Sequence, residues 1–205
     1  MQAAPQTPFT GESKASKAGQ AAAFGAFAGA AIGYVSGSDA GERRKRALIG
    51  AAGGAAIGGG VGYYMDRQEA ELRKQLQGTG VSVTRNGDEI ILNMPNSITF
   101  ATGGTELRPD AEEALKSVAL VMKEYDQTGA LITGHTDNTG SRAVNERISQ
   151  QRADVVGQYL AGQGVNARRM DRVGAAFDYP IASNATEEGR AQNRRVDITL
   201  VPLTE

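Results

Sequence analysis

The chain has 205 residues and a formal net charge of −1, so it lacks the excess of positive charge that nucleic-acid binding needs. It contains no cysteine, which excludes disulfides and thiol catalysis, and no tryptophan, which disfavours a platform for stacking sugars. A single histidine cannot make a metal site by itself. The length allows one domain of ordinary size with an appendage, and no nucleic acid is expected as a partner.

Two segments of the N-terminal third repeat glycine at every fourth position. The first contains Gly25, Gly29, Gly33 and Gly37, and the second contains Gly50, Gly54, Gly58 and Gly62. This spacing places the glycines on one face of a helix, where two helix backbones can approach closely. A polar and basic stretch, 38–46, separates the segments and suits a turn. Residues 19–65 are therefore predicted to form a glycine-zipper helical hairpin, preceded by a flexible tether over residues 1–18.

The glycines also limit the settings in which such a hairpin is stable. Each one costs about 1 kcal/mol relative to alanine inside a helix, so tight packing or a membrane must compensate. The apolar runs 21–35 and 47–64 are short against the roughly 20 residues that a membrane span needs. Three interpretations stay open: a packed hairpin associated with a membrane or an oligomer, a pair of membrane spans, and a mobile linker.

A charged segment and a series of short elements follow the zipper. Residues 66–80 are predicted to form a charged connector helix with a solvated face, and the folded domain is predicted over residues 81–205. Predicted strands cover 81–85, 89–94, 130–133, 172–177 and 195–201, and predicted helices cover 109–125, 144–160 and a short turn at 167–170, with irregular structure from 178 to 193. This order predicts an α+β sandwich in which two main helices back a mixed sheet.

The loop 134–141 is the most distinctive part of the predicted domain. It joins a predicted strand to the long helix and consists of turn and capping residues. Asp137 lies at the end of the strand and near the start of the helix, where open sheets tend to bind ligands. Arg152 lies further along that helix. One acid and one base on rigid elements suit a ligand that carries both charges, such as an amino acid with free ammonium and carboxylate groups.

Structural roles are open for the same residues. Asp137 would accept hydrogen bonds from backbone N–H groups of its own loop, as in an Asx turn. Arg152 would be a surface arginine paired with Asp154 or Glu146, which is worth less than about 1 kcal/mol. His135 is expected to fill a structural hydrogen bond at the end of the strand, because catalysis would need a nucleophile or a second acid beside it.

Two stretches of the chain resemble a known family. The sequence TGHTDNTGSRAVNERISQQRADVVGQYL (133–160) resembles the central motif of the outer-membrane protein A C-terminal domain family, and PIASNATEEGRAQNRRVDITLVP (180–202) resembles its closing segment. The resemblance covers roughly 81–202 and implies the OmpA-like βαβαβ sandwich. The glycine-rich N-terminal third together with this module is similar to YiaD-like outer-membrane lipoproteins. A precursor with a signal peptide and a lipid-acceptor cysteine before Met1 is the corresponding expectation.

The resemblance implies a ligand and a set of contacts for it. Asp137 matches the family's ligand-binding acid, and Arg152, fifteen positions later, matches the arginine that contacts the same ligand. The implied ligand is diaminopimelate in the stem peptide of peptidoglycan, whose side-chain end carries an ammonium and a carboxylate group. The further expected contacts are Thr139, Asn145, Ile148, Phe100, Thr102 and Arg194. Ile148 suits a core position equally well, and Arg194 a plain surface charge. The family commonly has aspartate where Ala101 stands, so one polar contact is missing.

The sequence leaves three functions open. The leading expectation is a non-enzymatic module that binds peptidoglycan and tethers an outer-membrane lipoprotein to the cell wall, on the periplasmic face of the outer membrane, with no cofactor and no metal. The alternative is a membrane-associated homo-oligomer or structural envelope protein that the glycine zipper assembles, with wall binding secondary. A wall hydrolase is the third, and it would need a general acid paired with a base or a metal.

Overall fold

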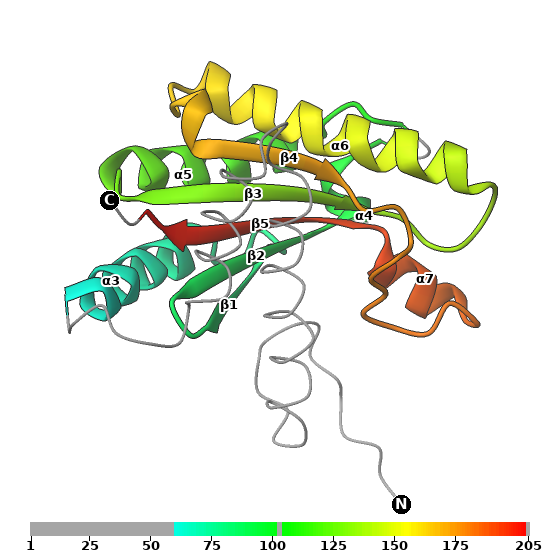
Figure 1. Ribbon diagram of the computed structural model, residues 1–205, viewed down its shortest axis with the longest axis horizontal. Helices are drawn as coiled ribbons and strands as arrows, with labels where there is room; N and C mark the ends of the chain where they lie inside the picture. Colours follow the sequence, from blue (N-terminus) through cyan, green and yellow to red (C-terminus); the bar gives the residue numbers. More distant parts are fainter. Residues whose placement is uncertain (1–59, 102–103, 204–205) are drawn as a thin grey trace, which may run out of the picture.

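A computed structural model describes residues 60–101 and 104–203. The predicted tether, the predicted zipper up to residue 59, and Thr102 lie outside the described residues. The described part has a five-stranded sheet with the strand order β1-β2-β5-β3-β4 (Figure 1). Its strands are β1 (Ser82–Asn86), β2 (Glu89–Pro95), β3 (Thr128–His135), β4 (Met170–Gly174) and β5 (Arg195–Pro202). Because β3 and β4 pair in parallel and the other neighbours pair antiparallel, the predicted mixed sheet is confirmed.

Along the chain, one helix precedes the first strand and the others lie between strands. They are α3 (Gly60–Gln75), α4 (Asn96–Thr99), α5 (Pro109–Glu124), α6 (Arg142–Gly162) and α7 (Glu187–Asn193), together with the 3-10 helix η1 (Ala167–Arg169). Pro109 opens α5, where its missing N–H is not needed for a helical hydrogen bond. The helices α5 and α6 match the two main helices that the sequence predicted.

One hydrophobic core lies between the helices and one face of the sheet. Alternate strand residues point into it, including Ile90, Leu92, Ile132, Ile198 and Leu200, and all of these are fully buried. Apolar side chains of α3, α5 and α6 pack against them. The period-two alternation predicted for the last strand is confirmed, because Val196 lies in the same core.

The charged helix before the domain is more than a solvated connector. It begins at Gly60, and its Met65, Gln68 and Leu72 are fully buried against the core. The Gln68 Nε2 group donates a hydrogen bond to the Thr128 Oγ1 atom over 3.1 Å. The charged side chains lie on the outer face of α3, and a narrow apolar stripe faces inward. The number of charged residues alone does not indicate that stripe. Within the described part of the chain, no helix is both long and apolar enough to cross a membrane.

The segment between β4 and β5 differs from the prediction in two places. The predicted strand 172–177 is observed as Met170–Gly174, because Ala176 takes a positive φ of 44° that ends the strand. The predicted irregular stretch contains α7, with Thr186 as its N-cap. The Thr186 Oγ1 atom accepts a hydrogen bond from the N–H of Gly189 over 3.1 Å, and this cap stabilises the helix despite its short length.

Candidate functional site

The loop between β3 and α6 is held by its own polar residues. Ser141 is the N-cap of α6. The Asn145 Nδ2 group donates to the backbone carbonyls of Thr139 over 2.9 Å and of Ser141 over 3.2 Å. The N–H of Thr139 donates to the Asp137 Oδ1 atom over 2.8 Å. Asp137 therefore does make the Asx-type hydrogen bond of the structural interpretation, and only one of its carboxylate oxygens is used for it.

Close packing of α6 on the sheet fixes the position of this loop. A Cβ atom on Gly134 would collide with the backbone carbonyl of Ser149, and one on Gly174 would come within 2.5 Å of the backbone nitrogen of Gln150. The Ser149 Oγ atom also accepts from the N–H of Ala176 over 3.1 Å. Glycine at both strand positions lets the helix backbone approach this closely, so the end of β3 and the start of α6 form one rigid support.

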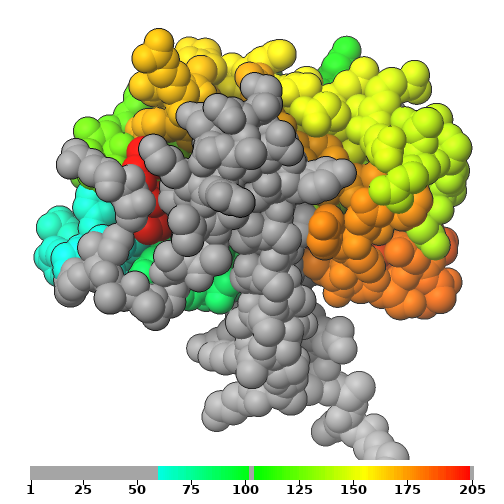
Figure 2. Space-filling view, in the orientation of Figure 1, coloured from blue at the N-terminus to red at the C-terminus, as the bar shows by residue number. Residues whose placement is uncertain are grey.

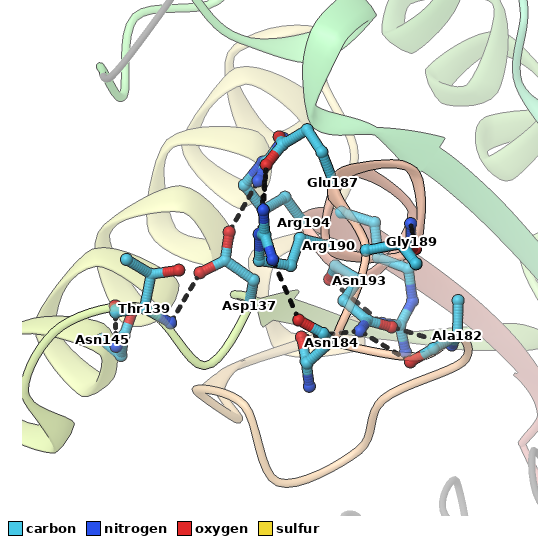
Figure 3. A network of polar contacts seen from close by, with 12 residues as sticks. Asp137, Thr139, Asn145, Ala182, Asn184, Glu187, Gly189, Arg190, Asn193 and Arg194 are labelled. Atoms are coloured by element: carbon cyan, nitrogen blue, oxygen red, sulfur yellow. Dashed lines mark hydrogen bonds and ion pairs between the residues drawn. The ribbon is translucent and has the colours of Figure 1, made fainter.

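The second oxygen of Asp137 pairs with Arg194. The Arg194 Nη1 group lies 2.6 Å from the Asp137 Oδ2 atom, and its Nη2 group lies 2.8 Å from the Glu187 Oε1 atom (Figure 3). Glu187 also pairs with Arg190 over 2.8 Å. Arg194 follows α7 directly, and α7 lies at the same end of the domain as the start of α6 (Figures 1 and 2). The closing segment of the chain thus supplies one side of the site.

Asn193 fixes the backbone next to Arg194. Its side chain is fully buried, and its Oδ1 atom accepts from the N–H groups of Ile181 over 2.8 Å and Ala182 over 2.9 Å. Its Nδ2 group donates to the carbonyl of Ala182 and to the Asn184 Oδ1 atom, each over 2.9 Å (Figure 3). The loop before α7 is therefore tied to the residue next to Arg194, which fixes the direction from which Arg194 reaches Asp137.

Sequence reasoning missed Glu187 and Asn193 because it placed irregular structure there. A usable signal was present: Thr186 precedes Glu187 and Glu188, and a hydroxyl cap followed by acids in the first turn is typical of a helix start. A helix ending at Asn193 places Glu187 and Arg194 about two turns apart on the same face. The pairing with Asp137, in contrast, follows only from how α7 lies against the β3–α6 loop.

Arg152 is a buried cation beside this network. Its side chain is 5% exposed, and its guanidinium lies 5.3 Å from the centre of the Phe100 ring. The Arg152 Nη2 group donates to the carbonyl of Gly104 over 3.3 Å, and its Nε atom is buried without a hydrogen-bond partner among the described residues. Within residues 60–101 and 104–203, no carboxylate lies within ion-pair distance of Arg152. The surface pairing with Asp154 or Glu146 is therefore wrong.

Burial and neighbouring charges shift the pKa values of the site residues. Burial raises the pKa of Asp137, but the hydrogen bonds from Arg194 and Thr139 and the charge of Arg194 outweigh it, so this pKa lies below its ordinary value. Burial and the charge of Arg194 lower the pKa of Arg152, and the charge of Asp137 raises it. Asp137, Arg152 and Arg194 thus lie within electrostatic range of one another, with more positive than negative charge.

The remaining expected contacts differ in how far their side chains are buried. Thr139 is exposed and Ile148 is half-buried, so Ile148 is not a full core residue. Phe100 is 2% exposed and belongs to the hydrophobic core. The Arg152 guanidinium packs over this buried ring. Asn145 is buried and holds the loop. Thr102 lies outside the described residues, so its role stays a prediction.

His135 lies at the end of β3. Its Nε2 atom is 3.4 Å from the Asp197 Oδ2 atom, which also pairs with Arg195 over 3.0 Å. Burial and the charge of Arg195 lower the pKa of His135 to about 4, so the imidazole is neutral at neutral pH. In the described part of the chain, no group of three or more histidine, aspartate or glutamate side chains is placed to hold a metal ion.

The fold is an α+β domain in which two oppositely charged side chains, Asp137 and Arg152, are buried at one end of a mixed sheet. Two family models match the chain: OmpA family over residues 99–194 and Glycine zipper over residues 19–69. The chain is 55% identical over 196 residues to the "Probable lipoprotein YiaD" of Escherichia coli (strain K12), a match that covers 96% of this chain and 89% of that protein. The chain therefore belongs to the OmpA family and combines its domain with a glycine zipper.

Two further relatives match the domain. The "Peptidoglycan-binding protein ArfA" of Mycobacterium bovis is 45% identical over 103 residues, which is 50% of this chain and 32% of that protein. A solved structure of the cell wall anchor of the T6SS from Pseudomonas aeruginosa superposes with a TM-score of 0.57 and 29% identity, covering 67% of this chain and 96% of that one. The predicted OmpA-like fold is thus confirmed.

Proposed function

We propose that this domain binds peptidoglycan without covalent chemistry and anchors an outer-membrane lipoprotein to the cell wall from the periplasmic face of the outer membrane. The relative from Mycobacterium bovis is named a peptidoglycan-binding protein, and the matched structure from Pseudomonas aeruginosa is a cell wall anchor. The matching YiaD protein is named a lipoprotein. The OmpA family match, 99–194, includes both Asp137 and Arg152.

The observation that carries the proposal is the state of Arg152. A cation that is 5% exposed and has no carboxylate within ion-pair distance in the described part of the chain bears a desolvation cost that one carbonyl and one aromatic ring offset only in part. A ligand carboxylate that reaches this guanidinium offsets that cost. Asp137 supplies the opposite charge for an ammonium group. The two together suit the side-chain end of diaminopimelate, which carries both groups on one carbon atom.

The pKa of Asp137 favours binding over catalysis. Burial raises this pKa, and Arg194 and Thr139 lower it further than burial raises it, so the carboxylate is ionised at neutral pH. A general acid must hold a proton at the working pH, whereas a hydrogen-bond acceptor for an ammonium group must be ionised. The proposed function is therefore recognition of the wall polymer rather than its hydrolysis, and it requires no cofactor.

The test is a pull-down with purified sacculi. We expect Asp137→Asn and Arg152→Gln each to weaken binding by at least about 30-fold, because cutting one partner of a buried charge contact costs roughly 2–5 kcal/mol. Asp110→Asn and Arg147→Gln are matched controls, since both residues are exposed on helices of the same domain. Circular dichroism of each variant reports whether the domain is folded.

Two outcomes contradict the proposal. Retained binding in both folded site variants would mean that the wall is held elsewhere. Release of soluble muropeptides from sacculi by the pure protein would favour a hydrolase instead.

A second function is favoured by the glycine zipper match over residues 19–69. In this alternative the zipper assembles a membrane-associated homo-oligomer, and wall binding is secondary. Deleting residues 1–59 discriminates the two. Loss of the oligomer in analytical ultracentrifugation with intact sacculus binding would assign assembly to the zipper and wall recognition to the domain.

A further inference from the structure

The pairing of Asp137 with Arg194 raises a question about selectivity within the proposed site. The carboxylate that would receive a ligand ammonium group already holds a guanidinium at 2.6 Å. An incoming ammonium group must either displace Arg194 from this carboxylate or share the carboxylate with a second positive charge. Glu187 offers Arg194 a second carboxylate at 2.8 Å, so Arg194 can remain partly neutralised when it loses Asp137.

The charges around the site show which ligands can win this competition. The cations are Arg152, Arg190 and Arg194, and the anions are Asp137 and Glu187. Three cations against two anions leave an excess of one positive charge. A zwitterionic ligand end keeps that excess unchanged, whereas a ligand end with only an ammonium group raises it. Repulsion in a partly buried site penalises the second case, because the site is screened less than open surface.

We propose that Arg194 strengthens the preference of the site for a ligand end that carries a carboxylate, and that Glu187 accepts Arg194 when the ligand displaces it from Asp137. Arg194 pairs with the Asp137 carboxylate, and an ammonium group alone displaces Arg194 poorly. A ligand that also brings a carboxylate compensates, since that carboxylate pairs with Arg152 and reduces the repulsion between the guanidiniums. The site thereby selects diaminopimelate-like ends over lysine-like ends. This inference rests on the proposed function and adds the source of its selectivity.

The test compares two stem peptides that differ only in diaminopimelate against lysine, titrated calorimetrically into the full chain at one ionic strength. We expect Arg194→Gln to reduce the preference for the diaminopimelate peptide by about twofold to fivefold, the range of a partly exposed ion pair. The lysine peptide gains affinity because its competitor for Asp137 is gone. Glu187→Gln should increase the preference, because Arg194 then pairs with Asp137 alone and the positive excess grows.

Glu188→Gln is the matched control. Glu188 lies in the first turn of α7, as Glu187 does, and is exposed. Its substitution removes the same charge from the same helix, and no described contact joins Glu188 to Arg194. Its preference should equal that of the parent protein. An unchanged preference in both Arg194→Gln and Glu187→Gln overturns the inference, and so does an equal change in Glu188→Gln.

The failure of this inference is distinguishable from that of the proposed function. If Asp137→Asn and Arg152→Gln abolish binding of the diaminopimelate peptide while Arg194→Gln leaves the preference intact, the site stands and the selectivity role of Arg194 falls. If the parent protein binds neither peptide, or the two site variants bind as well as the parent, both fail together.

Discussion

At the residue scale, Arg152 is unusual because its environment does not neutralise it. The guanidinium is supported by the Phe100 ring and by one carbonyl, that of Gly104, but its charge is not matched by a nearby carboxylate in the described part of the chain. Burial lowers its pKa, which is the expected response of a cation removed from water. A free-energy cost of this kind is tolerated where a ligand supplies the missing partner.

The cost leads to a prediction about stability. We expect Arg152→Met to raise the free energy of unfolding of the ligand-free protein by about 1 kcal/mol, since an apolar side chain of similar length fills the site without a buried charge. Urea titration measures the change. Arg147→Met, on the exposed face of the same helix, should leave stability nearly unchanged. A loss of stability in Arg152→Met would show that the ring and the carbonyl already compensate the charge.

At the scale of elements, the approach of α6 to the sheet positions the site. Gly134 on β3 faces the backbone of Ser149, and Gly174 on β4 faces that of Gln150. Any side chain at these positions would push the helix away from the sheet. Because the β3–α6 loop connects these two elements directly, a displaced helix also displaces Asp137 relative to Arg194.

Substitution of one glycine tests this coupling. We expect Gly134→Ala to lower the free energy of unfolding by about 1–3 kcal/mol, the usual cost of adding a methyl group to a close-packed contact. Gly162→Ala, at the end of α6, is the control because a Cβ atom there meets nothing within 4 Å. Thermal unfolding of both variants gives the comparison. Equal stability of the two variants would mean that the helix shifts freely on the sheet.

At the scale of the whole molecule, α3 belongs to the folded core although it precedes the first strand. Its buried Met65 and Leu72 belong to the same hydrophobic core as α5, and the Tyr64 ring lies edge-on to that of Tyr125 at 5.2 Å. In Figures 1 and 2, α3 lies at the opposite end of the sheet from α7. The chain therefore enters the domain at one end, and the candidate site occupies the other.

This arrangement predicts where the domain can be shortened. We expect deletion of residues 1–59 to leave the thermal midpoint of the domain nearly unchanged. Deletion through residue 77 should cost at least about 3 kcal/mol, because burial of a single large apolar side chain contributes roughly 1.5–3 kcal/mol and the second deletion removes Met65, Leu72 and Leu76. Differential scanning calorimetry of the two shortened proteins is the measurement. Equal midpoints would show that α3 adds nothing to the core.

The sequence by itself determined the succession of the five strands and the two main helices along the chain, because turn residues and apolar periodicity act over a few neighbouring positions. It also singled out Asp137, Arg152 and Arg194, through motifs that match a family. Only the tertiary structure decided that Arg194 pairs with Asp137, that α3 is part of the core, and that Arg152 is buried without a carboxylate partner in the described part of the chain. These three facts depend on contacts between segments far apart in the chain, and local patterns carry no information about which distant charge a side chain will meet.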